Sequence, residues 1–265
     1  MLGRMLMVVA TVIGGLIAGS LIGAGTAQAW QPTQTDRYDV QFVTPFNLVR
    51  GVDLAELDLF ETSPEQLKAL HARGVRTICY INAGAWENWR PDAHDFPAAV
   101  IGHDYAGWPG ERWLDIRARD QLAEILRKRI ELCRSKGFDA VEFDNVDGYA
   151  NHTGFAIAAK DQLAFNRWLA GEARAAGLAV ALKNSLELVP DLVGDFDFLI
   201  AEACFSQGEC AAAAPFRAAG KAVYVIEYTN QLRKMDRFCE DAAELGVQLI
   251  FKTKSLNGKL HRRCP

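Results

Sequence analysis

The stretch ARDQLAEILRKRIELCRSKGFDAVEFD, residues 118–144, contains the unit that decides the fold. Residues 118–136 are of helical type, and residues 138–143 form the short, largely apolar run expected of a parallel strand buried on both faces. Gly137 separates them, at the position where a glycine commonly follows the end of a helix. An acidic residue, Asp144, comes directly after the strand. The unit is therefore helix, glycine, strand and a polar residue at the strand end.

The same unit recurs along the chain and predicts a single-domain α/β fold, a (β/α)8 TIM-type barrel. An open doubly wound sheet is the alternative, but no GxGxxG motif follows the first strand. The glycines that precede later strands are Gly74, Gly177, Gly220 and Gly246. The expected strands are 38–43, 55–60, 75–81, 138–143, 178–182, 196–201, 222–226 and 247–251. The expected helices are 64–73, 118–136, 160–176, 188–194, 210–219 and 234–245.

The first 29 residues have the pattern of a secretory signal peptide. Arg4 is the only charged residue among them, a long apolar run follows, and Ala27-Gln28-Ala29 is a small-x-small cleavage pattern. The alternative is an uncleaved membrane anchor, because the apolar run is nearly long enough to span a bilayer. We expect a catalytic barrel domain over residues 30–265 that is secreted, extracellular or periplasmic, with no stable membrane association once the signal is cleaved.

Composition limits the partners of the chain. Without residues 1–29 it has 28 Lys and Arg against 33 Asp and Glu, one basic residue fewer than the full chain, which gives a net charge of -5. This mild acidity excludes nucleic acid as a partner, and nothing in the sequence indicates a metal or a cofactor. We also expect the chain to be a monomer.

Six cysteines in an exported chain predict disulfides. Cys204 and Cys210 could close a short loop, and Cys239 and Cys264 could tie the C-terminal tail to the last helix. Cys79 and Cys133 could pair with each other or remain buried free thiols.

Acidic residues at strand ends predict the chemistry. Active sites of such barrels lie at the C-terminal ends of the strands, and at least four of the expected strands end in a carboxylate. Glycoside hydrolysis needs two carboxylates on different strands, one to protonate the leaving oxygen and one to attack the anomeric carbon or to activate water. Strand alternation places Asp144 at the rim and Glu142 one layer deeper, so Asp144 is the candidate nucleophile. Glu202, at the end of 196–201, is the candidate acid/base.

Several of these residues have a structural explanation as well as a functional one. Asp58 and Asp147 could be caps, Glu202 could form a salt bridge with Lys183, and Lys183 could be a Schiff-base lysine. Residues 82–117 form a long connection with four tryptophans, which could stack on sugars or only pack the loop. The predicted substrate-binding residues are Asp58, Tyr80, Trp86, Trp89, Glu142, Asn145, Lys183, Glu227 and Tyr228.

The sequence resembles glycoside hydrolase family 114, the endo-α-1,4-polygalactosaminidases, over about residues 38–264. The most specific blocks are ICYINAGAWENWRPDA at 78–93 and FDAVEFDNVDGYANHTGF at 138–155. The resemblance implies a barrel fold and a catalytic pair equivalent to Asp144 and Glu202. It also implies a substrate polymer rich in α-1,4-linked galactosamine, whose ammonium groups suit an acidic cleft.

We therefore predict an endo-acting glycoside hydrolase with a retaining mechanism. The first alternative is a non-catalytic carbohydrate-binding barrel, or a glycosidase for another polysaccharide. The second is an aldolase that uses Lys183.

Overall fold

The computed structural model describes residues 30–48 and 50–265, and its central feature is a curled sheet whose main strands are all parallel. The predicted signal segment lies outside the described residues. All eight expected strands are present, within a few residues of their predicted bounds, and they pair in chain order. They are β1 (Tyr38–Gln41), β2 (Leu54–Asp58), β3 (Arg76–Asn82), β7 (Ala140–Asp144), β8 (Ala179–Lys183), β9 (Phe198–Glu202), β10 (Val223–Tyr228) and β11 (Gln248–Lys252).

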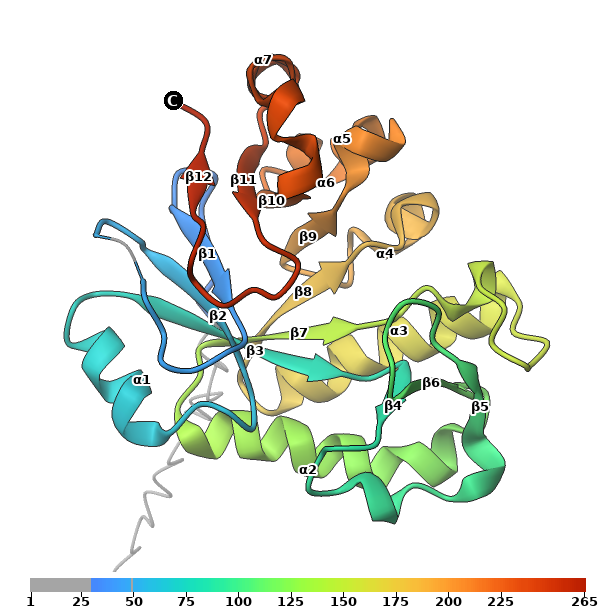
Figure 1. Cartoon of the computed structure of the whole chain (residues 1–265). Helices are drawn as coiled ribbons and strands as arrows, with labels where there is room; N and C mark the ends of the chain where they lie inside the picture. The colour runs from blue at the N-terminus through green and yellow to red at the C-terminus, as the bar shows by residue number, and fades with distance from the viewer. Residues whose placement is uncertain (1–29, 49) are drawn as a thin grey trace, which may run out of the picture.

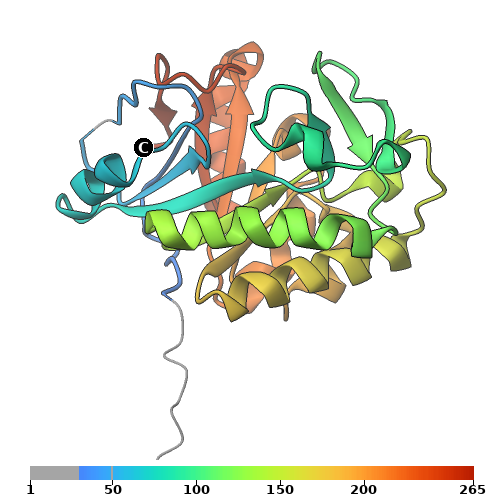
Figure 2. The same ribbon diagram turned by 90° about the horizontal axis from the view of Figure 1, so that it is seen from below.

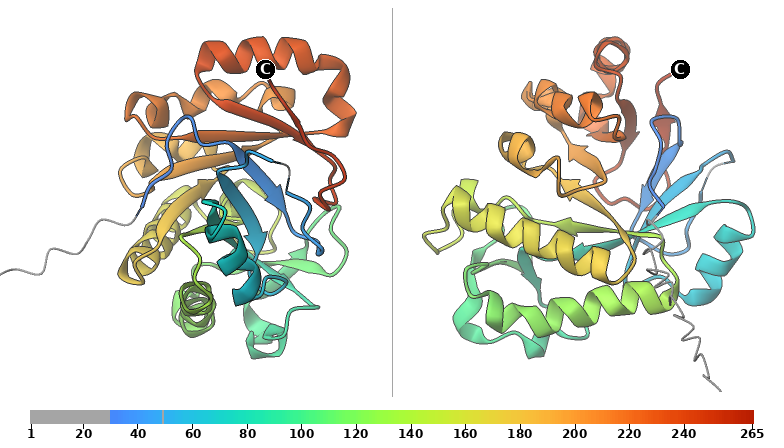
Figure 3. Two further views of the ribbon diagram at one scale, coloured as in Figure 1. Left: turned by 90° about the vertical axis from the view of Figure 1, so that its left-hand side faces the viewer. Right: turned by 180° about the vertical axis from the view of Figure 1, so that it is seen from behind.

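Helices surround the curled sheet on its outer side, as Figures 1 and 3 show. The two longest, α2 and α3, run side by side across one face (Figure 2). Each expected helix is present, although the two between β8 and β10 are shorter than predicted. The helices are α1 (Pro64–His71), α2 (Arg119–Lys136), α3 (Ala159–Ala175), α4 (Val189–Leu192), α5 (Cys204–Gln207), α6 (Ala214–Ala218) and α7 (Met235–Leu245). The predicted barrel class is confirmed.

Helix ends follow the signals read from the sequence. Ser63 caps α1, and the side chain of Gln66 accepts a hydrogen bond from the Ser63 backbone in return. Gly137 and Gly246 end α2 and α7 in the left-handed conformation, which costs glycine no Cβ clash.

The barrel closes between its first and last parallel strands through side chains and the C-terminal tail. The short strand β12 (Arg262–Arg263) pairs antiparallel with β11, and Arg263 donates a hydrogen bond to the Tyr38 carbonyl of β1. The fully buried Lys252 of β11 lies 2.5 Å from Asp39 of β1. Figure 1 shows β12 beside β1.

The long connection after β3 forms a small antiparallel sheet in the order β4-β6-β5, made of β4 (Ala85–Glu87), β6 (Glu111–Leu114) and β5 (Ile101–Asp104). The sheet contributes one wall of the pocket described below. In the described part of the chain, no helix is long and apolar enough to cross a membrane.

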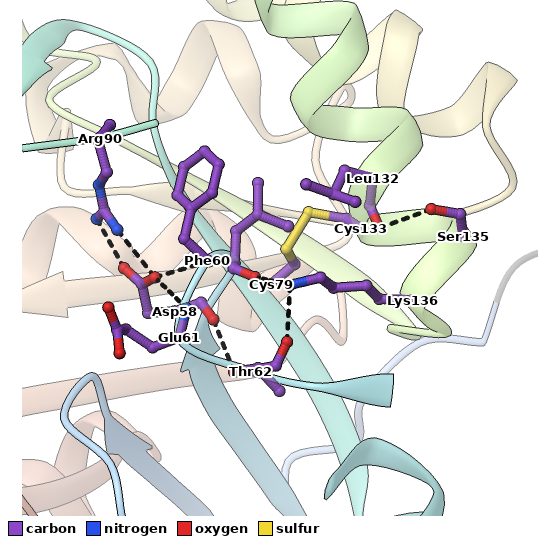
Figure 4. Close-up of a disulfide and its surroundings, with 11 residues drawn as sticks. Asp58, Phe60, Glu61, Thr62, Cys79, Arg90, Leu132, Cys133, Ser135 and Lys136 are labelled. Atoms are coloured by element: carbon purple, nitrogen blue, oxygen red, sulfur yellow. Dashed lines mark hydrogen bonds and ion pairs between the residues drawn. A yellow bond between two sulfur atoms is a disulfide. The ribbon is translucent and has the colours of Figure 1, made fainter. Parts of the chain in front are cut away.

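All six cysteines are paired. The predicted Cys204–Cys210 and Cys239–Cys264 bonds are present, and Cys79 and Cys133 also pair, joining β3 to α2 (Figure 4). The Cys79–Cys133 bond shows that these two cysteines pair and are not the buried free thiols that the sequence also allowed.

Candidate active site

A pocket of about 550 Å³ opens at the C-terminal ends of the parallel strands. The active sites of barrels of this kind lie at this end of the strands. Seven of the predicted site residues outside the long loop line this pocket: Asp58, Tyr80, Asp144, Asn145, Lys183, Glu202 and Tyr228.

Asp144 ends β7 at the floor of the pocket with both carboxylate oxygens engaged. Oδ1 accepts hydrogen bonds from the Lys183 ammonium, at 3.1 Å, and from the Asn145 backbone N–H, at 2.9 Å. Oδ2 accepts one from the Tyr80 hydroxyl at 3.0 Å. The side chain is 20% exposed, so its orientation is fixed while a substrate can still reach it.

Glu202 ends β9 and faces the same space. Its Oε1 accepts a hydrogen bond from the Tyr228 hydroxyl at 2.7 Å, and its backbone N–H donates to the Asn184 side chain at 2.8 Å. The side chain is 26% exposed. Among the described residues, its other oxygen, Oε2, has no hydrogen-bond partner, which leaves one side of the carboxyl available to a ligand.

Lys183, at the end of β8, stands between the two carboxylates. Its Nζ lies 3.1 Å from Asp144 Oδ1 and 3.8 Å from Glu202 Oε1. These two oxygens are therefore at most about 7 Å apart, the sum of the two distances. Burial alone would lower the pKa of Lys183, but the surrounding carboxylates outweigh it and raise this pKa well above its ordinary value. A lysine held protonated in this way is a poor nucleophile for a Schiff base, which argues against the aldolase alternative.

Glu142 lies one layer below Asp144 on the same face of β7, as the alternation of the strand predicted. It is fully buried and does not line the pocket, so the structure does not place it against substrate as the sequence analysis expected. Its Oε1 accepts a hydrogen bond from Lys183 at 3.2 Å. Two residues that the sequence analysis did not single out, Glu56 and Tyr38, complete this buried layer and hydrogen-bond to each other. Glu56 could have been found from the sequence, because it lies two residues before Asp58 on β2 and side chains two residues apart on a strand share a face.

Asp58 is engaged by an arginine of the long connection. Arg90 donates to both Asp58 oxygens, at 2.9 and 2.6 Å (Figure 4). It also binds Glu87. Asp58 also accepts hydrogen bonds from the backbone N–H groups of Phe60 and Glu61, as the capping interpretation proposed. Its contribution to the pocket is therefore mainly to fix Arg90 and the loop that follows β2.

Four further carboxyls line the pocket and were not chosen from the sequence as site residues: Glu61, Glu87, Glu111 and Asp147. Burial, followed by repulsion from Glu87 and Asp144, raises the pKa of Glu111 to about 8. Burial, followed by repulsion from Asp144, raises the pKa of Asp147 to about 6. Glu111 lies in the GWPGERW segment, where its position on β6 could have drawn attention to it.

Backbone strain is concentrated where the reactive side chains leave their strands. The residue after each of these side chains has a positive φ. The values are 61° for Asn145, after Asp144, 46° for Asn184, after Lys183, and 59° for Ala203, after Glu202. Such conformations cost a non-glycine residue free energy and cluster at functional sites. Gly84 has a related role, because a Cβ there would lie 1.7 Å from the Asn145 carbonyl oxygen.

Aromatic residues form the rim of the pocket. Trp89 and Trp108 line it and are 53% and 46% exposed, an unusual state for so large an apolar side chain unless a ligand covers it. Trp108 was noted in the sequence only as part of the long loop. Trp86, predicted as a sugar-binding residue, lies instead in a neighbouring hollow, and its indole N–H donates to the Ala93 carbonyl.

Glu227 was also predicted to contact substrate, but the structure places it elsewhere. Its side chain is fully buried and accepts hydrogen bonds from the backbone N–H groups of Phe205 and Ser206, at the start of α5. Because Glu227 is followed on β10 by Tyr228, which does line the pocket, strand alternation turns it to the opposite face.

Two carboxyls from different strands at the C-terminal mouth of a parallel barrel, beneath an aromatic rim, define a barrel glycoside hydrolase. The chain belongs to one family within this class, because the model of glycoside-hydrolase family GH114 matches residues 20–264. This confirms the resemblance seen in the sequence.

The chain is also similar to individual proteins in structure or in sequence. The crystal structure of Aspergillus fumigatus Ega3 in complex with galactosamine is 30% identical, with a TM-score of 0.85 over 91% of this chain and all of the other. The glycoside hydrolase domain of PelA from Pseudomonas aeruginosa has the same fold, with a TM-score of 0.63, 16% identity, and coverage of 85% of this chain and 96% of the other. An uncharacterized protein of Deinococcus radiodurans is 26% identical over 83% of this chain and 77% of its own length.

Proposed function

We propose that the protein is a secreted, endo-acting hydrolase of α-1,4-linked galactosamine polymers, with Asp144 and Glu202 as its catalytic residues. The observation that carries the proposal is the pair of partly exposed carboxyls that share one pocket with Lys183 between them. The 30% identical Ega3, crystallised with galactosamine, supports the choice of sugar. Three disulfides fit an oxidising compartment outside the cytoplasm.

The proposed reaction is a double displacement. Asp144 attacks the anomeric carbon while Glu202 donates its proton to the departing glycosidic oxygen, so one C–O bond forms as another breaks. Glu202 then removes a proton from water, which attacks the anomeric carbon and releases Asp144. The Tyr80 and Tyr228 hydroxyls hold the two carboxyls in place throughout.

Two features agree with the proposed retention. The upper limit of about 7 Å between the Asp144 and Glu202 oxygens is compatible with the roughly 5–5.5 Å carboxyl separation of retaining enzymes. Asp144 is also fixed by three hydrogen bonds, as suits a nucleophile that must attack one atom.

The test is to replace each carboxyl with its amide. We expect Asp144→Asn and Glu202→Gln to lower the release of reducing ends from partly deacetylated galactosaminogalactan on the order of 1,000-fold or more, with unchanged circular dichroism. NMR of the first product formed identifies the anomer. Near-wild-type turnover by either variant contradicts the assignment. Binding of the polymer by the wild-type protein without cleavage would instead support a carbohydrate-binding barrel.

A further inference from the structure

The barrel interior directly beneath the candidate catalytic pair is polar, and the proposed mechanism does not use it. Tyr38, Glu56 and Glu142 come from three different strands and are all fully enclosed, with exposed fractions of 1% or less. The only ammonium that the described structure places against this layer is that of Lys183. Its positive charge is therefore shared between the layer below and the catalytic carboxyls above.

The hydrogen bonds of Glu142 indicate which carboxyl in the layer holds a proton. Its Oε1 accepts from Lys183, but its Oε2 is enclosed and has no partner among the described residues. A buried carboxylate oxygen that accepts no hydrogen bond is costly. A protonated Oε2 is instead a donor, and the carboxyl it interacts with is Glu56, which already accepts a hydrogen bond from the Tyr38 hydroxyl.

Charge balance leads to the same assignment. If every acid were ionised, one ammonium would face the carboxylates of Glu56, Glu142, Asp144 and Glu202 in a largely enclosed space. Burial raises the pKa of Glu142 well above its ordinary value, and its carboxylate neighbours add to this effect despite the opposing pull of Lys183. The titratable groups that interact with Glu142 are Asp144 on its own strand and Tyr38, Glu56, Tyr80 and Lys183 on the surrounding strands.

We infer that Glu142 is protonated at neutral pH, and that Lys183 is a positioning residue whose charge is thereby reserved for Asp144 and Glu202. The inference rests on the proposed function. When the glycosyl-enzyme bond forms, the single negative charge of the pair leaves Asp144 and appears on Glu202. An ammonium 3.1 Å from one and 3.8 Å from the other stabilises the charge in both places without moving.

The first test compares replacements of the two residues. In Glu142→Gln a neutral side chain that can still donate to Glu56 replaces a neutral acid, so we expect kcat within about threefold of wild type and an unchanged kcat/KM pH profile. Lys183→Met should lower kcat on the order of 100-fold with little change in KM. It should also move the acidic limb of the profile to higher pH, because a carboxylate without a neighbouring ammonium is easier to protonate. Lys183→Arg keeps a positive charge at this position. It should therefore have a higher kcat than Lys183→Met and an acidic limb closer to that of the wild type.

A structural control separates positioning from stability. Asp197 is buried at the other end of the sheet, where it binds the Val180 backbone N–H and Arg174. Asp197→Asn should lower the melting temperature and leave the pH profile in place. A Lys183→Met enzyme with the wild-type profile would overturn the positioning role. An acidic limb displaced by more than about one pH unit in Glu142→Gln would overturn the proton assignment.

The second test needs no substrate. Infrared difference spectra of wild type minus Glu142→Gln at neutral pH should contain the C=O band of a protonated carboxyl, and its absence would overturn the proton assignment. If instead the wild-type protein releases no reducing ends from the galactosamine polymer, the proposed function fails, and the infrared result still decides the state of Glu142.

Discussion

Glu111 lines the pocket, and no basic side chain in the described part of the chain forms an ion pair with it. Its Oε2 accepts a hydrogen bond from the Asn82 amide at 3.2 Å, and the guanidinium of Arg90 binds Glu87 and Asp58 instead. Burial, together with the charges of Glu87 and Asp144, therefore keeps this carboxyl protonated up to about pH 8.

The protonation of Glu111 predicts how stability changes with pH. The pKa of Glu111 is about 8 in the folded chain and about 4.3 in the unfolded one, so the folded state binds the proton more tightly. The resulting stability is complete below about pH 4.3 and is lost as pH rises through about 8, with a slope of at most about 1.4 kcal/mol per pH unit. Glu111→Gln should remove this slope in urea unfolding between about pH 5 and pH 9. Glu124→Gln, at an exposed position on α2, should keep the wild-type slope, and an identical slope in Glu111→Gln would refute the prediction.

At the residue scale, the sequence predicts what depends on alternation along one strand. Asp144 above Glu142 follows from the period of two, and the position of Glu202 follows from the end of an apolar run. The role of Asp58 depends on Arg90, which lies 32 residues later in a loop whose path no local pattern specifies.

At the element scale, two of the disulfides differ in the length of chain that they close and in the elements that they join. Cys79–Cys133 fixes β3 to α2 across 54 residues, whereas Cys204–Cys210 closes six residues directly after Glu202. A cross-link stabilises mainly by restricting the unfolded chain, and this effect grows with the length of the closed loop.

The two bonds should therefore respond differently to removal. We expect Cys79→Ala with Cys133→Ala to lower the free energy of unfolding by about 4 kcal/mol, and Cys204→Ala with Cys210→Ala by about 2 kcal/mol. The second pair should lower kcat more, because α5 follows the strand end that carries Glu202. Urea unfolding and kcat at saturating polymer check both expectations. A larger stability loss from the shorter loop would contradict them.

The sequence predicts elements wherever a glycine or proline marks their ends, as at Ser63-Pro64 and Gly137. It is less informative for residues 82–117, where β4, β5 and β6 pair across turns and build a wall of the pocket. Their pairing is a non-local property, set by how the loop packs against β3 and β7. The positive φ of Ala203 is likewise imposed by tertiary structure, because alanine has no preference for it.

At the scale of the whole molecule, residues 30–265 carry a net charge of -5, and the pocket is rich in carboxyls. A polymer with unacetylated amino sugars is a polycation and should be attracted before it makes contact. This long-range attraction is screened by salt, since the Debye length falls from about 30 Å at 0.01 M to about 10 Å at 0.1 M. Substrate capture, rather than the chemical step, should therefore depend on ionic strength.

We expect kcat/KM on deacetylated galactosamine polymer to fall about tenfold between 0.01 and 0.3 M NaCl, while kcat at saturating substrate changes little. The matched control is a fully N-acetylated polymer of the same length, which carries no charge and should show almost no dependence on salt. Initial rates of reducing-end release over the salt series measure both. Equal salt dependence for the two polymers would mean that salt acts on the protein itself, and the acidic pocket would then have no part in attracting the substrate.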